Sequence, residues 1–180
     1  MRPLTEEETE AVFAKLVKYI GDNVRLLLER EDGKYCFRLH KERVHYSSEE
    51  LMRRAGVVGR DQLIMWGTCL GKFTKTRKFH LHITALDYLA PYAKVKVWLK
   101  PGGEQQFLYG NHILKSAVAR ISETAQTNDG AVIFNLQNTP LGFGVLAKDA
   151  AGVKRADPTA MVALHQADVG EYLRKESSLT

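Results

Sequence analysis

Cations interleaved with aromatic rings occur twice in this 180-residue chain, and both occurrences suit the binding of nucleic acid. The first lies around Phe73 and Phe79, and its basic residues are Lys72, Lys75, Arg77 and Lys78. Cationic side chains contact phosphates while aromatic rings stack on bases. The alternative interpretation is a solvated hairpin tip, because exposed lysine and arginine need no functional reason.

The second occurrence is the segment 94–100, where apolar residues alternate with three lysines that share a face with Trp98. Those lysines are Lys94, Lys96 and Lys100. As a strand, this segment would turn its valines and leucine inward and its cations and indole outward. The outer face can hold phosphates while the indole stacks on a base or shields a lysine stem. The alternative is an ordinary amphipathic strand with Trp98 in a domain interface.

No motif in the chain indicates catalysis. The stretch from Gly67 to Thr74 superficially resembles a phosphate-binding loop, but three residues rather than four separate its glycines and Phe73 replaces the hydroxyl residue that binds magnesium. His80 and His82 share one face of a predicted strand, yet two ligands make no coordination set. Recognisable nucleophile contexts and glycine-rich cofactor fingerprints are also absent from the sequence. We therefore predict no enzymatic activity, no metal and no cofactor.

Composition predicts a folded, soluble protein of one or two domains. The chain is 44% hydrophobic, and 26 lysines and arginines against 21 acidic residues give a net charge of +5. This excess attracts polyanions, but residues 1–92 (16 minus 13 charges) and 93–180 (10 minus 8) are similarly basic, so charge does not choose the binding half. Cys36 and Cys69 form no C-x-x-C motif, which favours buried thiols in a reducing compartment. No signal peptide or membrane-spanning segment is recognisable.

The N-terminal half predicts helices and an antiparallel sheet. Thr5 and Glu8 form a capping box at the start of a helix whose apolar face is Phe13, Leu16, Val17 and Ile20 and which ends at Gly21. Ser47, with Glu50, begins a second short helix that continues through about Arg54. Predicted strands are 24–29, 35–40, 44–46, 63–66 and 79–84, with a hairpin turn at Asp32-Gly33.

The sequence changes to a series of short strands and turns after a short helical turn at 86–90, which must end before Pro91. Predicted strands then recur at 94–100, 118–122, 132–135, 143–148 and 161–166 and predict a small β-barrel. We place the domain boundary near residue 93. The expected fold class is α+β, with a mixed α/β domain over 1–93 and a β-rich domain over 94–180.

Longer motifs in the C-terminal half resemble the PUA domain, an RNA-binding pseudo-β-barrel. They are Pro101–Glu104, Phe107–Lys115, Pro140–Gly144 and His165–Arg174. Together with 2–5, 71–76 and 85–92, they make nearly the whole chain resemble the nuclear import protein seven family of eukaryotic large-ribosomal-subunit biogenesis factors. Two places depart from the usual PUA pattern: Gly103 stands where alanine is common, and Ala117-Val118-Ala119 occupies a place where glycine is usual.

The resemblance implies an N-terminal α/β domain for protein contacts and a C-terminal PUA-type pseudo-β-barrel for RNA. It further implies a non-enzymatic factor in pre-rRNA processing and 60S subunit assembly, located in the nucleus and nucleolus, with no membrane association. The implied partners are pre-ribosomal RNA and other assembly factors, and the protein is expected to be a monomer within a larger ribonucleoprotein. Two alternatives stay open: a protein adaptor within pre-ribosomal particles, and an RNA-modifying enzyme or its accessory, because PUA modules often accompany such enzymes.

Candidate RNA contacts form three groups. Matching to the PUA pattern implies Gly110, Asn111, His112, Lys115 and Arg174. Basic neighbours added by charge alone are Arg120, Lys154, Arg155 and Lys175. The two segments that mix cations with aromatic rings, containing Lys72, Lys75, Arg77 and Lys78, and Lys94, Lys96 and Lys100, are predicted as a secondary RNA contact.

Overall fold

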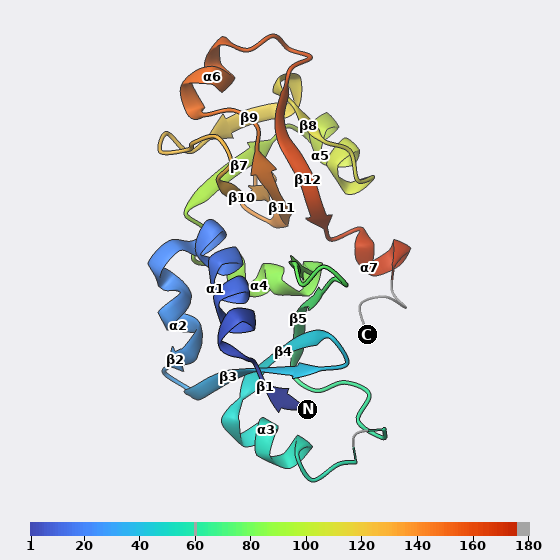
Figure 1. Ribbon diagram of the computed structural model, residues 1–180. Coiled ribbons are helices and arrows are strands. Elements are labelled where there is room, and N and C mark those ends of the chain that lie inside the picture. The colour runs from blue at the N-terminus through green and yellow to red at the C-terminus, as the bar shows by residue number, and fades with distance from the viewer. Residues whose placement is uncertain (60, 176–180) are drawn as a thin grey trace.

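The computed structural model describes residues 1–59 and 61–175 and places two sheets one above the other (Figure 1). The N-terminal elements are β1 (Arg2–Pro3), α1 (Glu6–Ile20), η1 (Gly21–Val24), α2 (Arg25–Leu28), β2 (Glu29–Arg30), β3 (Gly33–His40), β4 (Arg43–Ser48), α3 (Glu49–Ala55), β5 (Thr68–Phe73), β6 (Phe79–Leu81), η2 (Ile83–Ala85) and α4 (Leu86–Leu89). The C-terminal elements are β7 (Val95–Leu99), α5 (Pro101–Leu108), β8 (Ile113–Leu114), η3 (Lys115–Ala117), β9 (Val118–Ile121), β10 (Gly130–Phe134), β11 (Pro140–Leu146), α6 (Ala150–Arg155), β12 (Met161–Asp168) and α7 (Glu171–Arg174). Within the described ranges, no helix has the length and apolar character needed to cross a bilayer.

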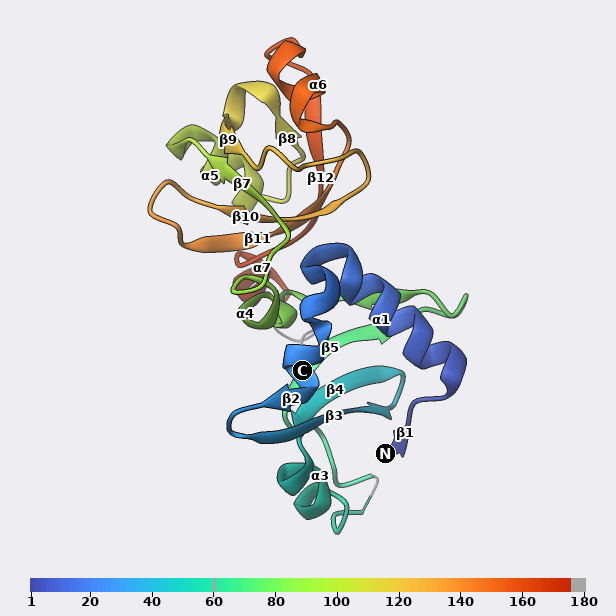
Figure 2. The same cartoon turned by 90° about the vertical axis from the view of Figure 1, so that its left-hand side faces the viewer.

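The N-terminal sheet is antiparallel, with the order β1-β3-β4-β5-β6 and β2 paired beside β3. Helix α1 packs against it, as Figure 2 shows. The predicted capping box of Thr5 and Glu8 is confirmed, and the helix ends at Gly21 with φ +58°. Its buried face is rotated slightly from the predicted one: Val12 and Tyr19 are buried, whereas Val17 is 45% exposed.

Two local predictions were wrong. The segment 24–29 is mostly helical, because Val24 and Leu27, three residues apart, are buried while Leu26 faces solvent. The segment 63–66 is not a strand. The next strand is instead β5, which contains the residues that superficially resembled a phosphate-binding loop. Gly71 is required there, because a Cβ atom would lie 2.1 Å from the carbonyl oxygen of His80 on β6.

Other N-terminal predictions were confirmed or shifted by one residue. The strands predicted at 35–40 and 44–46 correspond to β3 and β4, and the helical turn at 86–90 corresponds to α4. The second helix is capped by Ser48 rather than Ser47, since the Ser48 hydroxyl accepts from the Leu51 amide at 3.3 Å. Cys36 and Cys69 are both free thiols and both buried.

The C-terminal sheet is strongly curved and has the order β8-β12-β11-β10-β7-β9. Strands β7 and β10 pair in parallel, and the other neighbouring strands pair antiparallel. Val95, Val97 and Leu99 of β7 are fully buried inside it, which confirms the alternation predicted for this segment. The predicted PUA-type pseudo-barrel following an α/β unit is therefore the observed fold class.

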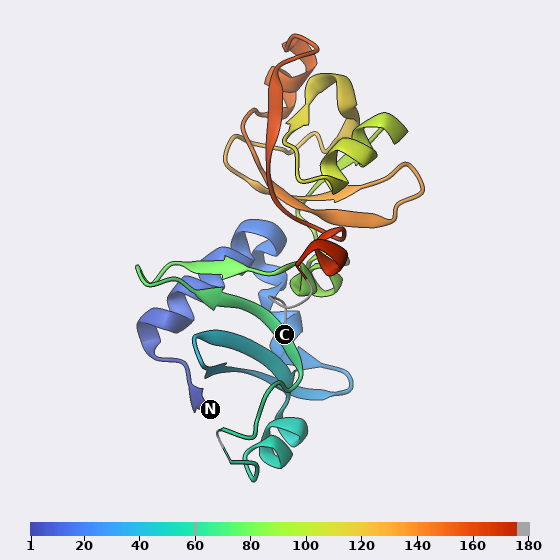
Figure 3. The ribbon, with the colours of Figure 1, turned by 90° about the vertical axis from the view of Figure 1, so that its right-hand side faces the viewer.

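The two sheets share a hydrophobic core through α1 and α4, which lie between them (Figures 1 and 3). The ring of Tyr19 on α1 contacts that of Phe143 on β11 edge-on, with centroids 5.3 Å apart. Gly130 opens β10 directly against Tyr19, where a Cβ atom would lie 2.7 Å from the ring. The backbone amide of Lys94 also donates to the carbonyl oxygen of Tyr19 at 2.8 Å. The shared core thus fixes the position of β7 relative to α1. The domain boundary near residue 93 stays a prediction.

Candidate nucleic-acid interface

A surface groove of about 720 Å³ runs between α5 and β8. It is lined by Lys100, Gly102, Gly103, Gln106, Asn111, His112, Ile113, Leu114, Ser116, Ala117 and Met161. Asn111 and His112, which the resemblance implied as RNA contacts, therefore lie on its wall, together with Lys100 from the predicted secondary contact. The mixed lining of amides, an imidazole, a cation and apolar side chains is suited to a ligand that has both phosphates and bases.

The turn after α5 positions the implied contacts. Gly110 has φ +88°, a conformation that side-chain-bearing residues rarely adopt, so glycine is explained there by the backbone alone. Asn111 follows, and its amide nitrogen donates to Gln106 Oε1 at 2.9 Å. His112 Nδ1 accepts from the backbone amide of His165 on β12 at 3.1 Å. Lys115 opens η3 beside the groove, and within the described residues no carboxylate lies within 4.0 Å of its ammonium group.

The outer face of β7 leads directly into this groove. Lys96 and Trp98 occupy that face, and Lys100, two residues further, lines the groove. Trp98 pairs across the strands with Arg120 on β9, whose Cζ atom lies 3.7 Å from the centroid of the indole. Lys96 Nζ lies 5.6 Å from the ring centroid of Phe134 on β10. The structure thus brings Lys100 together with Asn111 and His112 in the groove wall, and it brings Arg120 onto Trp98 on the strand that leads to Lys100.

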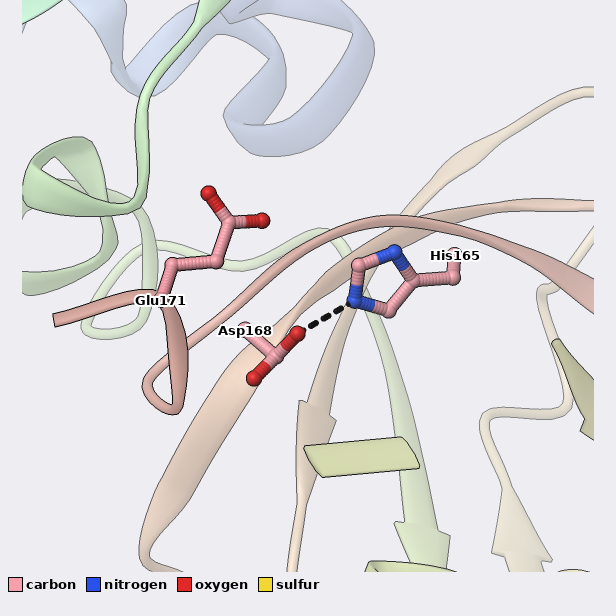
Figure 4. Close-up of side chains that lie close together, drawn as sticks. All are labelled: His165, Asp168 and Glu171. Carbon is pink, nitrogen blue, oxygen red and sulfur yellow. Dashed lines mark hydrogen bonds and ion pairs between the residues drawn. The ribbon is translucent and has the colours of Figure 1, made fainter. Parts of the chain in front are cut away.

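Arg174 is held by a buried carboxylate instead of projecting freely. Its Nη2 lies 2.7 Å from Asp168 Oδ2, and its Nη1 donates to the carbonyl oxygen of Leu108 at the end of α5. Asp168 is fully buried at the end of β12, and His165 Nε2 lies 2.6 Å from the same oxygen (Figure 4). Burial raises the pKa of Asp168, but the hydrogen bonds from His165 and Arg174 outweigh it and hold that pKa below its ordinary value.

The sequence did not predict the Asp168 network. His165 and Asp168 lie in a motif that is recognisable only by its resemblance to the PUA domain. No pattern of alternating residues in the sequence indicates that Asp168 is buried. Glu171 approaches the same two residues, and ligand atoms of all three lie within 4.8 Å of one another (Figure 4). Arg174 already neutralises Asp168, and Lys175 Nζ lies 3.7 Å from Glu171. The geometry is that of a salt-bridge network that fastens α7 to α5.

The remaining predicted contacts lie away from the groove. Lys154 and Arg155 end α6, at the far end of the C-terminal sheet from α7 (Figure 1). Lys72 lies on β5, and Lys75, Arg77 and Lys78 form the exposed hairpin before β6, on the opposite side of the molecule from α5 (Figure 2). Arg77 Nη1 lies 3.5 Å from Glu7, and Lys94 Nζ lies 3.8 Å from Asp129. RNA contact by these residues stays a prediction.

A cysteine and a histidine come together in the N-terminal sheet, but in the wrong state for a nucleophile. Cys69 Sγ lies 3.8 Å from His82 Nδ1. Burial raises the pKa of Cys69, and burial, reinforced by neighbouring cations, lowers the pKa of His82 to about 4. A reactive cysteine needs a lowered pKa, so this pair lacks the thiolate that nucleophilic catalysis requires.

Comparison with known proteins gives the same domain order. Residues 1–83 match a family model described as the NIP7/UPF0113 pre-PUA domain, and residues 95–177 match the UPF0113 PUA domain. The chain is 59% identical to the "60S ribosome subunit biogenesis protein NIP7 homolog" of Xenopus laevis and 58% identical to those of Danio rerio and Mus musculus, over 100% of each chain. Among solved structures it resembles a PUA domain from Aeropyrum pernix K1, at 13% identity and a TM-score of 0.61, covering 99% of this chain and 90% of that one. It also resembles a conserved PUA domain protein from Thermoplasma acidophilum, at 12% identity and a TM-score of 0.57, covering 96% and 95%.

Proposed function

The chain belongs to the NIP7/UPF0113 family and is a 60S ribosome subunit biogenesis factor, and we propose that it acts there by binding pre-ribosomal RNA through the α5–β8 groove and the adjoining face of β7. The observation that carries this proposal is that Lys100, which directly follows β7 and its Trp98–Arg120 pair, lines the same groove as Asn111 and His112. We further propose that it works in the nucleus and nucleolus, as a monomer within pre-ribosomal particles and without catalytic activity.

The cations of this surface are available to a polyanion. Within residues 1–59 and 61–175, no carboxylate lies within 4.0 Å of the charged groups of Lys96, Lys100, Lys115 or Arg120. Lys94, Arg174 and Lys175, in contrast, each have an acidic partner. Unpaired cations along a groove attract phosphates and release counterions when they bind them. We therefore propose the four unpaired cations as the principal phosphate contacts.

A second groove favours a protein contact in the N-terminal half, as an additional role within the same particles. Its volume is about 810 Å³, and it lies between the α2–β2 segment and α4, with Tyr88 and Tyr92 in its wall. Among the described residues, no cation lies within 4.0 Å of the carboxylates of Glu29, Glu31 or Asp87 in this groove. Such a surface repels phosphates and complements a basic segment of another assembly factor.

Crosslinking in cells separates RNA binding from a purely adaptor role. Ultraviolet crosslinking of the tagged protein, followed by sequencing of the attached RNA, should recover precursors of large-subunit rRNA. The variant Lys100→Glu/Lys115→Glu should lose these reads while still copurifying with assembly factors. The variant Glu29→Lys/Asp87→Lys should keep the reads but no longer copurify with assembly factors. The absence of precursor reads from the unaltered protein would favour the adaptor, and a new protein-dependent nucleotide modification would overturn the non-enzymatic assignment.

A further inference from the structure

Three side chains form a row across the outer face of the C-terminal sheet. Phe134 on β10, Trp98 on β7 and Arg120 on β9 occupy matching positions in the strand register. The rings of Phe134 and Trp98 are stacked, with centroids 6.0 Å apart and 29° between their planes. The Cζ atom of Arg120 lies 3.7 Å from the Trp98 centroid, a separation typical of van der Waals contact between stacked groups. Phe134 is only 6% exposed whereas Arg120 is exposed, so the row begins in the core and ends in solvent.

The surroundings fix the indole before any ligand arrives. Trp98 Nε1 donates to Asn138 Oδ1 at 2.8 Å, from the turn between β10 and β11. Asn138 has φ +63°, a conformation that asparagine tolerates better than most residues. One edge of the ring is therefore anchored to a neighbouring turn, while Phe134 supports it from the core side. A platform fixed in this way loses little side-chain entropy when it binds a ligand.

Arg120 holds its guanidinium over this platform without an acidic partner. Within residues 1–59 and 61–175, no carboxylate and no other hydrogen-bond acceptor is within bonding distance of its nitrogen atoms. The guanidinium is planar, so the face turned away from Trp98 can accept a second flat group. Lys96 and Lys100 lie two residues to either side of Trp98, each about 7 Å away along the extended chain.

We infer that an unpaired nucleobase stacks on the outer face of the Arg120 guanidinium, while Lys96 and Lys100 contact the flanking phosphates, so that this face takes single-stranded RNA. Bases splayed out of a single strand stack on arginine planes and aromatic rings, whereas bases inside an A-form helix are already stacked on their neighbours. The inference rests on the proposed RNA binding and specifies the form of RNA that this part of the surface accepts.

The test uses the full-length protein with two RNA probes. The first is an oligoadenylate of about 12 nucleotides, and the second is the same strand paired with oligouridylate. The chain has two tryptophans, of which Trp66 is only 5% exposed, so RNA-dependent changes in indole emission should report mainly on Trp98. We expect the single strand to change this emission, the duplex to leave it unchanged, and Trp98→Phe to abolish the response.

Two substitutions of Arg120 separate stacking from simple charge attraction. Arg120→Ala should weaken oligoadenylate binding about tenfold, within the range found for the loss of one stacked base. Arg120→Lys keeps the positive charge but loses the planar guanidinium group, so it should weaken oligoadenylate binding nearly as much as Arg120→Ala does. Arg53→Ala removes an exposed cation from α3, at the opposite end of the molecule (Figure 1), and should bind like the unaltered protein.

The outcomes distinguish this inference from the proposed function beneath it. If Arg120→Lys binds like the unaltered protein, or if the duplex changes Trp98 emission as much as the single strand does, the base-stacking inference is overturned while RNA binding stands. If neither RNA binds the unaltered protein at low ionic strength, both the inference and the proposed function fail.

Discussion

Gly103 on α5 lies so close to Ala117 in η3 that a Cβ atom on Gly103 would come within 2.6 Å of the Ala117 Cβ. The same atom would lie 3.0 Å from the Ala117 carbonyl oxygen. Gly103 stands where the sequence comparison with the PUA pattern led us to expect alanine, and Ala117 belongs to the segment 117–119, where we expected a glycine. The structure therefore brings the two departures together in one contact, between Gly103 and Ala117.

Exchanging the two residues should preserve this contact, and changing only the first should not. Gly103→Ala should lower the free energy of unfolding by about 1–3 kcal/mol, because the added methyl group overpacks the interface between α5 and η3. Gly103→Ala/Ala117→Gly should recover most of that stability. Urea denaturation measures both values. Gly102→Ala is the matched control on the same helix, since its Cβ would meet nothing within 4 Å. Additive effects in the double variant would contradict direct contact.

Much of the fold could be predicted from local sequence signals. The capping box at Thr5 and the alternation in β7 were visible, because each depends on residues close together in the chain. The segment 24–29 was misassigned because a short apolar run does not distinguish a strand from a buried helical turn. Leu63 and Trp66 are buried without belonging to a strand, so the apolar character of this segment predicted its burial but not its secondary structure.

The site was less predictable, because its residues meet only through sheet register. Trp98 was recognised beside lysines of its own strand, but its partner Arg120 is 22 positions further along the chain and joins it through the pairing of β7 and β9. The PUA-like motif points to Arg174, whereas nothing in the sequence indicates that its partner Asp168 is buried. Whether a cation is free or paired is therefore a property of the tertiary structure.

The ion pair between Asp168 and Arg174 should contribute to stability. Arg174→Ala leaves the fully buried Asp168 without its guanidinium partner, which should lower the free energy of unfolding by about 2 kcal/mol. In an Asp168→Asn background, the same substitution should cost clearly less, because no buried charge is left unpaired. A thermodynamic double-mutant cycle by urea denaturation measures this coupling.

Lys175→Ala serves as the charge-matched control for this cycle. Its Nζ lies 3.7 Å from Glu171, and its side chain is 58% exposed, so its removal should cost at most about 0.5 kcal/mol. Equal destabilisation by Arg174→Ala and Lys175→Ala would show that α7 is not fastened through the buried carboxylate.

Acid should release the N-terminal strand from α1 through Glu8. Hydrogen bonds from Arg2 lower the pKa of Glu8 to about 2, against burial and with further help from the Thr5 amide. Because the folded-state pKa lies below the ordinary value of 4.5, ionised Glu8 stabilises the fold above that value, and this contribution is lost as pH falls toward 2. Glu8→Gln keeps a capping side chain but removes the charge.

The stability difference between the unaltered protein and Glu8→Gln should therefore shrink as pH falls from 4.5 toward 2. Chemical denaturation across this range measures it. Glu10→Gln removes a charge from the same helix without touching Arg2 and controls for net charge. A difference that is constant with pH would mean that the bond to Arg2 adds no pH-dependent stability.

Removing the unpaired cations of the groove should change the salt dependence of RNA binding as well as its strength. Each cation that no longer binds a phosphate should reduce the slope of log affinity against log salt concentration by about 0.7 for a single strand, because one fewer counterion is released. Lys100→Gln and Lys115→Gln should each show this reduction, and the double variant should show about twice as much. Arg53→Gln on α3 removes the same charge far from the groove and should leave the slope unchanged. Titrations of a labelled oligoadenylate at several salt concentrations provide the slopes. Equal changes for all the variants would indicate that only net charge matters and that the groove is not where phosphates bind.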